Sequence, residues 1–173
     1  MKNLLIVLMA LLLIHLNSNA QINIIPKPNE IKITEGKFAY AKGVDVKVIR
    51  GDEATKIVNQ QIIDFLKRNK VPIVSFSPNI ISINLLKENT IPNDGYEMNI
   101  SPNAIAISSS SAAGLFYGVQ SLIQLMNTDT LKSLTCMKIK DEPAFANRGL
   151  QLDVAHTFFN TDIIKQYIEA ISK

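Results

Sequence analysis

Two pairs of adjacent carboxylates, Asp52-Glu53 and Asp141-Glu142, are the most obvious candidates for acid–base chemistry in this sequence. A carboxyl group near a second one can act as a general acid or base when its pKa is shifted. Asp52-Glu53, however, opens a predicted helix, where negative side chains are stabilised by the helix dipole. Asp141-Glu142 stands before Pro143 in a predicted linker. We therefore expect neither pair to be catalytic.

Cys136 is the only cysteine, and His156 is the only histidine after the first twenty residues. A single cysteine cannot form an intrachain disulfide, and a reactive or metal-bound thiol needs neighbouring groups that stabilise the thiolate. The residues around Cys136 have the pattern of a half-buried strand, so we expect a buried, inert thiol. Nothing in the sequence positions His156 as a catalytic base, and its role is left open. We predict no metal site and no cofactor.

The charge of the chain argues against a nucleic-acid partner. Lys and Arg number 18 against 15 Asp and Glu, a formal net charge of +3. Nucleic-acid-binding domains concentrate basic residues into a patch or stripe. Here the longest basic clusters, Lys67-Arg68 with Lys70 and Lys138 with Lys140, are short, and we interpret them as solvated surface.

The first twenty residues have the pattern of a secretory signal peptide. Lys2 is followed by an apolar run from Leu4 to Ile14, and Ser18-Asn19-Ala20 provides small residues at a cleavage site. The run is shorter than the roughly 20 residues that span a bilayer, although a retained N-terminal anchor is the alternative. We expect export to the periplasm or the extracellular space, a mature chain from Gln21, and no membrane contact after cleavage.

Alternating apolar residues predict the strands of the mature chain. Ile31 and Ile33 on one side of Glu35-Gly36, with Phe38 and Tyr40 on the other, predict a hairpin. Further strands are predicted at 44–48, 71–76, 80–86, 96–100, 105–107 and 134–139, with a second hairpin between 96–100 and 105–107.

Apolar stripes at helical spacing predict three helices. The first follows Asp52 as N-cap, and the second begins within Ser108 to Ser111. Gly114 and Gly118 lie in the second helix, where each costs about 1 kcal/mol relative to Ala. We expect close packing of this helix on a sheet to compensate. The third helix runs from Asp162 to Ile171, with Thr161 as its cap.

These elements predict an α/β (α+β) fold, in which residues 21–140 form a small sheet covered by two helices. Residues 141–147 form a linker. Residues 148–173 supply a strand, 148–155, and the third helix. This last unit does not fit the first layer, and we interpret it as the start of a second, incomplete domain.

Three stretches carry a resemblance to a known family: Ile25-Pro26-Lys27-Pro28, the segment from Gly95 through Ala113–Leu125, and Asp141–Ala155. They resemble bacterial family 20 glycoside hydrolases, the β-N-acetylhexosaminidases. The first two are similar to that family's small N-terminal domain, and the third is similar to its linker and the first strand of its TIM barrel. Similar small domains precede barrels in O-GlcNAcase-like and α-glucuronidase families, but Arg-Gly-Leu-Gln-Leu-Asp-Val-Ala favours the hexosaminidases.

The resemblance implies hydrolysis of terminal N-acetylglucosamine or N-acetylgalactosamine from a carbohydrate substrate. Family 20 uses substrate-assisted retaining catalysis, in which the 2-acetamido group replaces an enzyme nucleophile. In the family, an Asp orients this group and the adjacent Glu is the general acid, near the end of the fourth barrel strand. The sequence ends earlier, so we expect no catalytic residue in this chain and no activity of the chain alone.

The resemblance carries two residues over to this chain. Arg148 matches the family arginine that binds hydroxyls of the terminal sugar, a task that suits a guanidinium fork; a structural ion pair is the alternative. Asp153 is a candidate for supporting the site, or else an ordinary salt-bridge partner. The motif then departs from the family, because His156-Thr157 stand where Arg-His is usual.

Two other functions are compatible with the sequence. The chain could be a non-catalytic secreted binding module, or the N-terminal part of another barrel glycosidase of the O-GlcNAcase-like kind. A binding module that stopped here would leave the apolar faces of the 148–155 strand and the last helix exposed, which secreted monomers rarely tolerate. The sequence does not give the hexosamine linkage or the oligomeric state.

Overall fold

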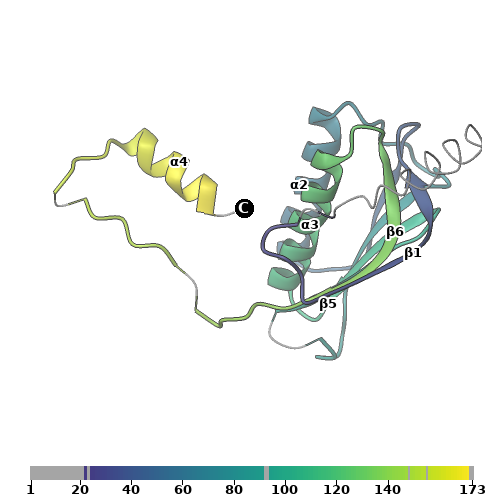
Figure 1. The fold of residues 1–173 in the computed structure, drawn as a ribbon, viewed down its shortest axis with the longest axis horizontal. Helices are drawn as coiled ribbons and strands as arrows, with labels where there is room; N and C mark the ends of the chain where they lie inside the picture. The colour runs from purple at the N-terminus through teal and green to yellow at the C-terminus, as the bar shows by residue number, and fades with distance from the viewer. Residues whose placement is uncertain (1–21, 23, 92–93, 148, 155, 172–173) are drawn as a thin grey trace, which may run out of the picture.

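A six-stranded sheet in the order β1-β6-β4-β5-β3-β2 carries two helices on one face in the computed structural model of the chain (Figure 1). The structure describes residues 22, 24–91, 94–147, 149–154 and 156–171. The strands are β1 (Glu30–Ala39), β2 (Asp45–Arg50), β3 (Ile80–Leu85), β4 (Tyr96–Ile100), β5 (Ala104–Ser109) and β6 (Ser133–Asp141). The helices are α2 (Glu53–Arg68), α3 (Ala112–Thr128) and α4 (Thr161–Ile171). The predicted mixed fold, a sheet covered by two helices, is confirmed.

The sheet is mixed in direction. β2, β3 and β5 are parallel, whereas β4 pairs antiparallel with both β5 and β6, and β1 pairs antiparallel with β6. α2 connects β2 to β3, because two parallel neighbours need a crossover connection. The predicted hairpin of β4 and β5 is confirmed, with Met98 opposite Ile107.

The hairpin predicted between residues 31 and 40 is wrong. These residues form one strand, β1, and both of its halves pair with β6: Ile33 lies opposite Met137, and Lys37 opposite Thr135. Gly36 has a φ of 104°, a left-handed conformation that favours glycine, but it lies in a bulge rather than in a turn. Alternation revealed the extended backbone and left the partner strand undetermined.

The strand predicted at 71–76 is also wrong. Only an isolated bridge joins Ile73 to Val44. Pro72 has no N–H to donate to a ladder, and its carbonyl accepts a bond from the Val44 N–H. Phe76 has a φ of 62°, which breaks the extended backbone. The segment is therefore a turn that ends before β3.

The two helices of the layer begin at the predicted caps. The Asp52 carboxylate accepts a bond from the Thr55 N–H at 2.8 Å, and the Thr55 hydroxyl oxygen accepts one from the Asp52 N–H at 3.2 Å. This reciprocal pair is a capping box. Ser111 caps α3 with a single bond, in which its hydroxyl oxygen accepts the Gly114 N–H at 3.0 Å.

The two glycines of α3 lie against the sheet, as predicted. A Cβ on Gly118 would lie 2.7 Å from Ile107 Cγ2 and 3.0 Å from Tyr96 Cδ2, and a Cβ on Gly114 would overlap the carbonyl oxygen of Gly95. The close approach buries Leu115, Val119 and Leu122 between α3 and the sheet. Packing thus offsets the poor helix propensity of glycine.

The C-terminal region differs from the sequence prediction in two ways. The described residues 149–154 form no strand, because a strand needs a neighbour to accept its hydrogen bonds and this segment lies beside none (Figure 1). The N-cap of α4 is Asn160 rather than Thr161, since the Asn160 Oδ1 accepts the Ile163 N–H at 3.0 Å. None of the α4 residues is buried.

Some predictions fall outside the described residues. They include the signal peptide at residues 1–20 and the sugar-binding role of Arg148. Across the described ranges, no helix is both long enough and apolar enough to cross a bilayer.

Candidate functional site

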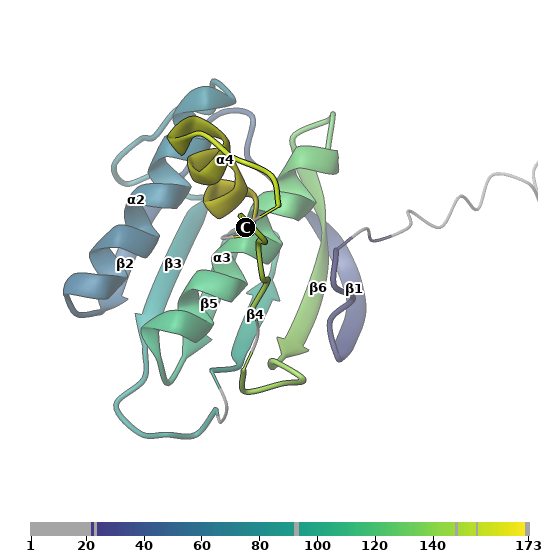
Figure 2. The same cartoon turned by 90° about the vertical axis from the view of Figure 1, so that its left-hand side faces the viewer.

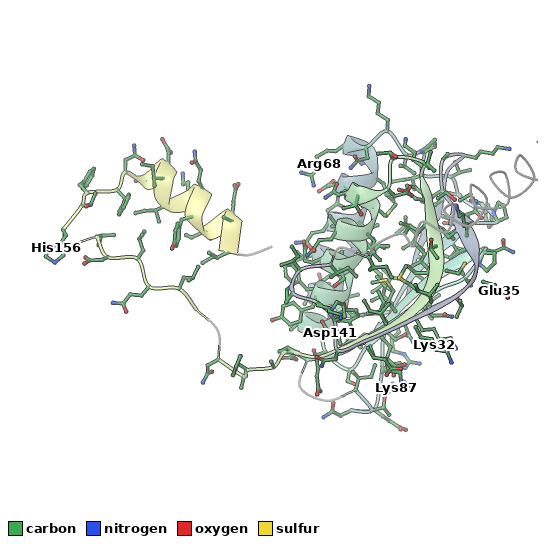
Figure 3. The ribbon with its side chains drawn as sticks, in the orientation of Figure 1. Lys32, Glu35, Arg68, Lys87, Asp141 and His156 are labelled. Carbon is green, nitrogen blue, oxygen red and sulfur yellow. The ribbon has the colours of Figure 1, made fainter. Side chains whose placement is uncertain are left out.

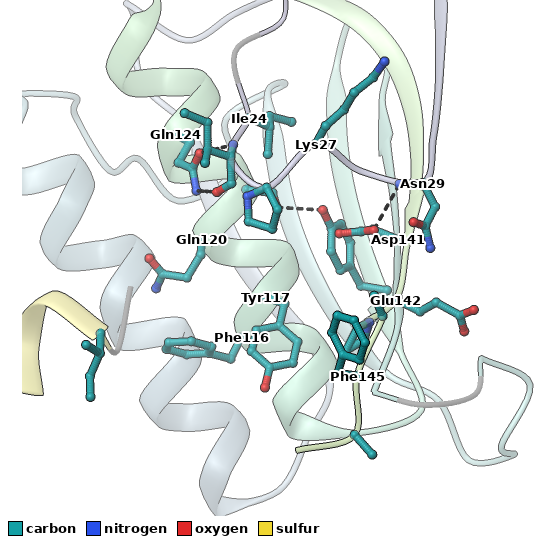
Figure 4. Close-up of a pocket in the computed structure, with 18 residues that line it drawn as sticks. Ile24, Lys27, Asn29, Phe116, Tyr117, Gln120, Gln124, Asp141, Glu142 and Phe145 are labelled. Carbon is teal, nitrogen blue, oxygen red and sulfur yellow. Dashed lines mark hydrogen bonds between the residues drawn. The ribbon is translucent and has the colours of Figure 1, made fainter. Parts of the chain in front are cut away.

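A groove of about 870 Å³ runs along the outer side of α3 (Figure 4). Its floor is the α3 surface that carries Phe116, Tyr117 and Gln120. One wall is the N-terminal segment, which we define as Ile24–Asn29, and the other is the start of the linker, Asp141–Ala146. Three segments distant in sequence therefore meet on the helical face of the sheet.

The floor of the groove is uncharged because α3 is uncharged. None of its 17 residues is acidic or basic, whereas α2 carries Glu53, Lys56, Asp64, Lys67 and Arg68. The Phe116 and Tyr117 rings meet edge to face with centroids 5.7 Å apart. Gln120 Nε2 donates to Gln61 Oε1 at 3.1 Å, which ties the floor to α2. The groove therefore offers aromatic rings and amides to a partner.

Side chains of α3 and β6 hold the N-terminal segment in place. Gln124 binds the backbone of Ile25 twice: its Oε1 accepts the Ile25 N–H at 2.8 Å, and its Nε2 donates to the Ile25 carbonyl at 3.0 Å. Asp141 Oδ1 accepts the Asn29 N–H at 3.1 Å. This contact gives one acid of the Asp141-Glu142 pair a structural task, in keeping with the prediction that the pair is not catalytic.

Tyr96 lies under the groove and is fixed by a buried hydrogen bond. Its hydroxyl is 2.6 Å from the Ser121 hydroxyl. The pKa of Tyr96 is raised to about 12, mainly by burial; the Ser121 bond lowers the pKa, and the nearby Asp141 carboxylate raises it. Tyr96 therefore stays protonated at neutral pH and serves packing rather than proton transfer.

A second, smaller hollow of about 260 Å³ lies where β1, β4 and β6 meet the start of the linker. Lys140 Nζ pairs with Glu97 Oε1 at 2.8 Å across two adjacent strands. The hydrogen bond that Lys140 donates to the Glu97 carboxylate raises the pKa of Lys140 above its usual value. Both side chains are largely exposed, so this ion pair adds little to stability.

Of the predicted site residues, Asp153 lines neither hollow, and Arg148 lies outside the described residues. Asp153 is 59% exposed, and its Oδ2 lies 3.8 Å from His156 Nε2. Figure 3 shows His156 at the outer bend of the C-terminal segment, well away from Asp141 and the sheet. Within the described residues, no three His, Cys, Asp or Glu side chains lie close enough to hold a metal ion.

The prediction of a buried Cys136 is confirmed. Its side chain is 1% exposed, and burial raises the pKa of the thiol above its usual value. The bulge at Gly36 lies next to the sulfur, since a Cβ at this position would be 3.3 Å from Cys136 Sγ. A thiol that is covered and protonated is a poor nucleophile.

Sequence reasoning predicted the α3 stripe but missed the groove on its other side. One signal was present, because α3 has no charged residue, whereas the outer face of a surface helix is typically charged or polar. The walls of the groove could not be predicted from local sequence. The N-terminal segment and the linker come to lie beside α3 only because of the order in which the strands are arranged in the sheet.

Comparison with known proteins gives a consistent family. Residues 21–142 match the family described as glycosyl hydrolase family 20, domain 2. A β-hexosaminidase from Porphyromonas gingivalis is 28% identical over 165 residues, covering 87% of this chain and 21% of the relative. An N,N'-diacetylchitobiase from Vibrio harveyi is 29% identical over 145 residues, covering 82% of this chain and 16% of the relative.

A solved structure shares the fold. The family 20 β-N-acetylhexosaminidase of Streptomyces coelicolor A3(2) superposes with a TM-score of 0.70 at 24% identity, covering 86% of this chain and 32% of that one. The chain spans 21% and 16% of the length of the two curated relatives named above. Because the family match extends over most of the sequence, the chain belongs to glycoside hydrolase family 20, whose N-terminal domain it contains.

Proposed function

We propose that this chain is the N-terminal part of an exported exo-β-N-acetylhexosaminidase that removes terminal N-acetylglucosamine or N-acetylgalactosamine from carbohydrates. The observation that carries the proposal is the family 20 match over residues 21–142. The names of the relatives, β-hexosaminidase and N,N'-diacetylchitobiase, support the substrate class. The signal-peptide pattern of residues 1–20 supports export.

The proposed chemistry is substrate-assisted hydrolysis with retention of configuration. The acetamido oxygen of the substrate attacks the anomeric carbon while a general acid protonates the departing glycosidic oxygen. Water then opens the oxazolinium ion and restores the acetamido group. In this proposal the orienting Asp and the acid Glu belong to a part of the enzyme beyond Lys173. Asp52-Glu53 is not a candidate, because Asp52 caps α2.

Residues 148–173 begin the catalytic (β/α)8 barrel in this proposal. Leu150 and Val154 are 65% and 56% exposed, and they need neighbouring strands to cover them. Active sites of such barrels form at the carboxyl ends of the strands. Arg148 would hold hydroxyls of the terminal sugar, and Asp153 would support the site near the end of the same strand.

Hydrolysis of an aryl N-acetyl-β-glucosaminide tests the proposal. We expect no turnover by the isolated 173-residue chain, and turnover by the native protein captured with an antibody against residues 21–145. Within the native enzyme, Arg148→Lys keeps the charge but loses the fork, so kcat/KM should fall more than tenfold, by about 2 kcal/mol of transition-state binding. Lys138→Ala, on the open face of the sheet, is the matched control. Turnover by the isolated chain would contradict the assignment of the acid pair.

A non-catalytic carbohydrate-binding module is the second candidate, because the groove on α3 combines aromatic rings with amides. Such a mixture of apolar and polar lining is typical of small-ligand sites. Calorimetric titration of the chain with chito-oligosaccharides distinguishes the two. Binding that Tyr117→Ala abolishes would favour the module, and the absence of binding at millimolar sugar would favour the enzyme part.

A further inference from the structure

Phe76 is presented to solvent by a turn in a strained conformation. Its side chain is 93% exposed, more than that of any other large apolar residue among those the structure describes. Its φ of 62° lies in the left-handed region, which is costly for a bulky residue. Because the ring is exposed, burial does not compensate for this strain. Glycine or asparagine would suit the backbone better, so the fold alone does not account for a phenyl ring here.

Hydrogen bonds fix the turn that carries the ring. The Phe76 N–H donates to Asp45 Oδ2 at 2.9 Å. The next residue, Ser77, donates its hydroxyl to the Gly43 carbonyl at 3.2 Å, and its Oγ accepts the Asn79 N–H at 3.2 Å. The backbone around Phe76 is therefore held on both sides. A ring on a fixed backbone loses little freedom when a partner binds, which favours binding.

A charged pair lies beside this turn. Asp45 Oδ2, which accepts the Phe76 N–H, also pairs with Lys47 Nζ at 3.2 Å. The Asp45 side chain is 13% exposed, whereas that of Lys47 is 43% exposed. An ammonium group has three donors, so Lys47 can also donate to a ligand at the surface. An aromatic face next to a few polar groups is typical of small-ligand sites.

The turn lies at the opposite end of the sheet from the linker. β6 runs in the same direction as β2 and β3, because β4 is antiparallel to both β5 and β6, and β5 is parallel to β3 (Figure 2). The turn leads into the start of β3, whereas the linker follows the end of β6. Phe76 also lines neither of the two hollows. The exposed ring is therefore a feature separate from the α3 groove.

A pyranose ring of the N-acetylglucosamine type suits a single rigid phenyl ring. All ring substituents of this sugar in its β-linked form are equatorial, so its axial C–H groups form two apolar faces. Their slight positive charge matches the negative face of an aromatic ring. A stable protein partner needs a wide contact of about 800 Å² on each side. Phe76 instead stands between two polar residues of the chain, Ser75 and Ser77.

We propose that Phe76 is a sugar-binding residue, whose ring stacks on an N-acetylglucosamine unit of a polymeric chain. The contact holds the polymer against the small domain, and the strain of the turn is the cost of presenting the ring. The proposal rests on the proposed function for its substrate class, which the name N,N'-diacetylchitobiase of one relative supports. It does not depend on turnover.

Adsorption of the native protein to insoluble chitin tests this contact. Phe76→Asn removes the ring but keeps a residue that tolerates the left-handed backbone, and adsorption should weaken about three- to tenfold. Phe76→Trp keeps an aromatic face and should retain adsorption. Ile57→Ala is the matched control, because Ile57 is 67% exposed on α2 and alanine favours a helix. Its adsorption should equal that of the unmodified protein.

Thermal unfolding separates a binding role of the ring from a structural one. Phe76→Asn should keep or raise Tm, since it relieves backbone strain, whereas a ring that stabilises the fold would lower Tm on removal. Unchanged adsorption of Phe76→Asn, or a loss in Phe76→Trp or Ile57→Ala, would overturn the proposal.

Two further results distinguish this proposal from its alternatives. A Phe76→Asn variant that adsorbs normally but sediments as a smaller species would overturn the sugar contact and assign the ring to a contact between protein chains. Adsorption is measured without hydrolysis. A native protein that adsorbs through Phe76 but does not cleave the aryl N-acetyl-β-glucosaminide would therefore support the sugar contact and contradict only the enzyme proposal.

Discussion

Gly118 and its neighbours determine how close α3 can lie to the sheet. A methyl group at this position would lie 2.7 Å from the buried Ile107 side chain and 3.0 Å from the Tyr96 ring. Neither group can move freely, because Ile107 is fully buried and Tyr96 is hydrogen-bonded to Ser121. The position therefore tolerates only glycine without rearrangement of the core.

We expect Gly118→Ala to destabilise the chain by about 1–3 kcal/mol, because overpacking outweighs the better helix propensity of alanine. Gly149→Ala is the control, since a Cβ there meets no atom within 4 Å, and its effect should lie within about 0.5 kcal/mol. Urea denaturation measures both. A stabilised Gly118→Ala variant would mean that α3 lies farther from the sheet than described.

The buried Tyr96 hydroxyl makes the free energy of unfolding depend on pH in the alkaline range. Burial raises its pKa from 10.0 to about 12 in the folded state. The folded state therefore binds this proton more tightly than the unfolded state. The stability that the protonated hydroxyl contributes is fully present below pH 10 and is lost as the pH rises through about 12. Burial and the neighbouring Asp129 also raise the pKa of Tyr40, which adds to the loss in the same direction.

Tyr96→Phe should flatten the fall in stability above pH 10, and it should cost about 1–3 kcal/mol at neutral pH because Ser121 loses its buried partner. Thermal unfolding at a series of pH values measures both effects. Tyr117→Phe, on the groove floor, is the matched control. An unchanged alkaline profile in Tyr96→Phe would contradict the buried hydroxyl pair.

At the scale of elements, the capping box at the start of α2 makes a testable contribution to the stability of the fold. Hydrogen bonds from Thr55 lower the pKa of the Asp52 carboxyl. A lowered pKa means that the cap stabilises the fold above the ordinary pKa of aspartate and is lost as the pH falls through the lowered value. Asp52→Ala should lower Tm at neutral pH. Asp52→Asn should lower Tm much less, because asparagine also caps helices well. Equal losses in both variants would show that charge, rather than the hydrogen bond, matters.

The elements that could be predicted are those whose signals are local. Both helices of the layer and the β4–β5 hairpin carry a cap, a stripe or a turn within a few residues. The hairpin predicted at 31–40 failed because Gly36 makes a bulge, and the choice of β6 as the partner of β1 depends on residues about a hundred positions away. The strand predicted at 148–155 is not formed at the described residues 149–154, since a strand forms only beside another.

The groove was not predictable in detail for the same physical reason. Its floor is one helix, but its walls are the N-terminal segment and the linker, which meet α3 only after the sheet is assembled. The sequence analysis predicted the apolar stripe of α3 and its packing on the sheet, but it made no prediction about the outer face of this helix. Arg148 and Asp153 came from resemblance, and their roles stay predictions.

The whole molecule combines a small α/β domain with a C-terminal region that this domain does not cover. The family 20 match ends at residue 142, close to the point where β6 ends and the linker begins. The chain also spans only 21% and 16% of two relatives. These observations support the proposal that the chain is the N-terminal part of a longer family 20 enzyme.

The intact mass of the native exported protein, captured with an antibody against residues 21–145, tests this account most directly. We expect a species several times heavier than the 19.2 kDa chain, beginning at Gln21, because the proposed enzyme has a catalytic barrel after the small domain. A species that matches residues 21–173 would contradict the account, and the function of the protein would then have to be binding rather than hydrolysis.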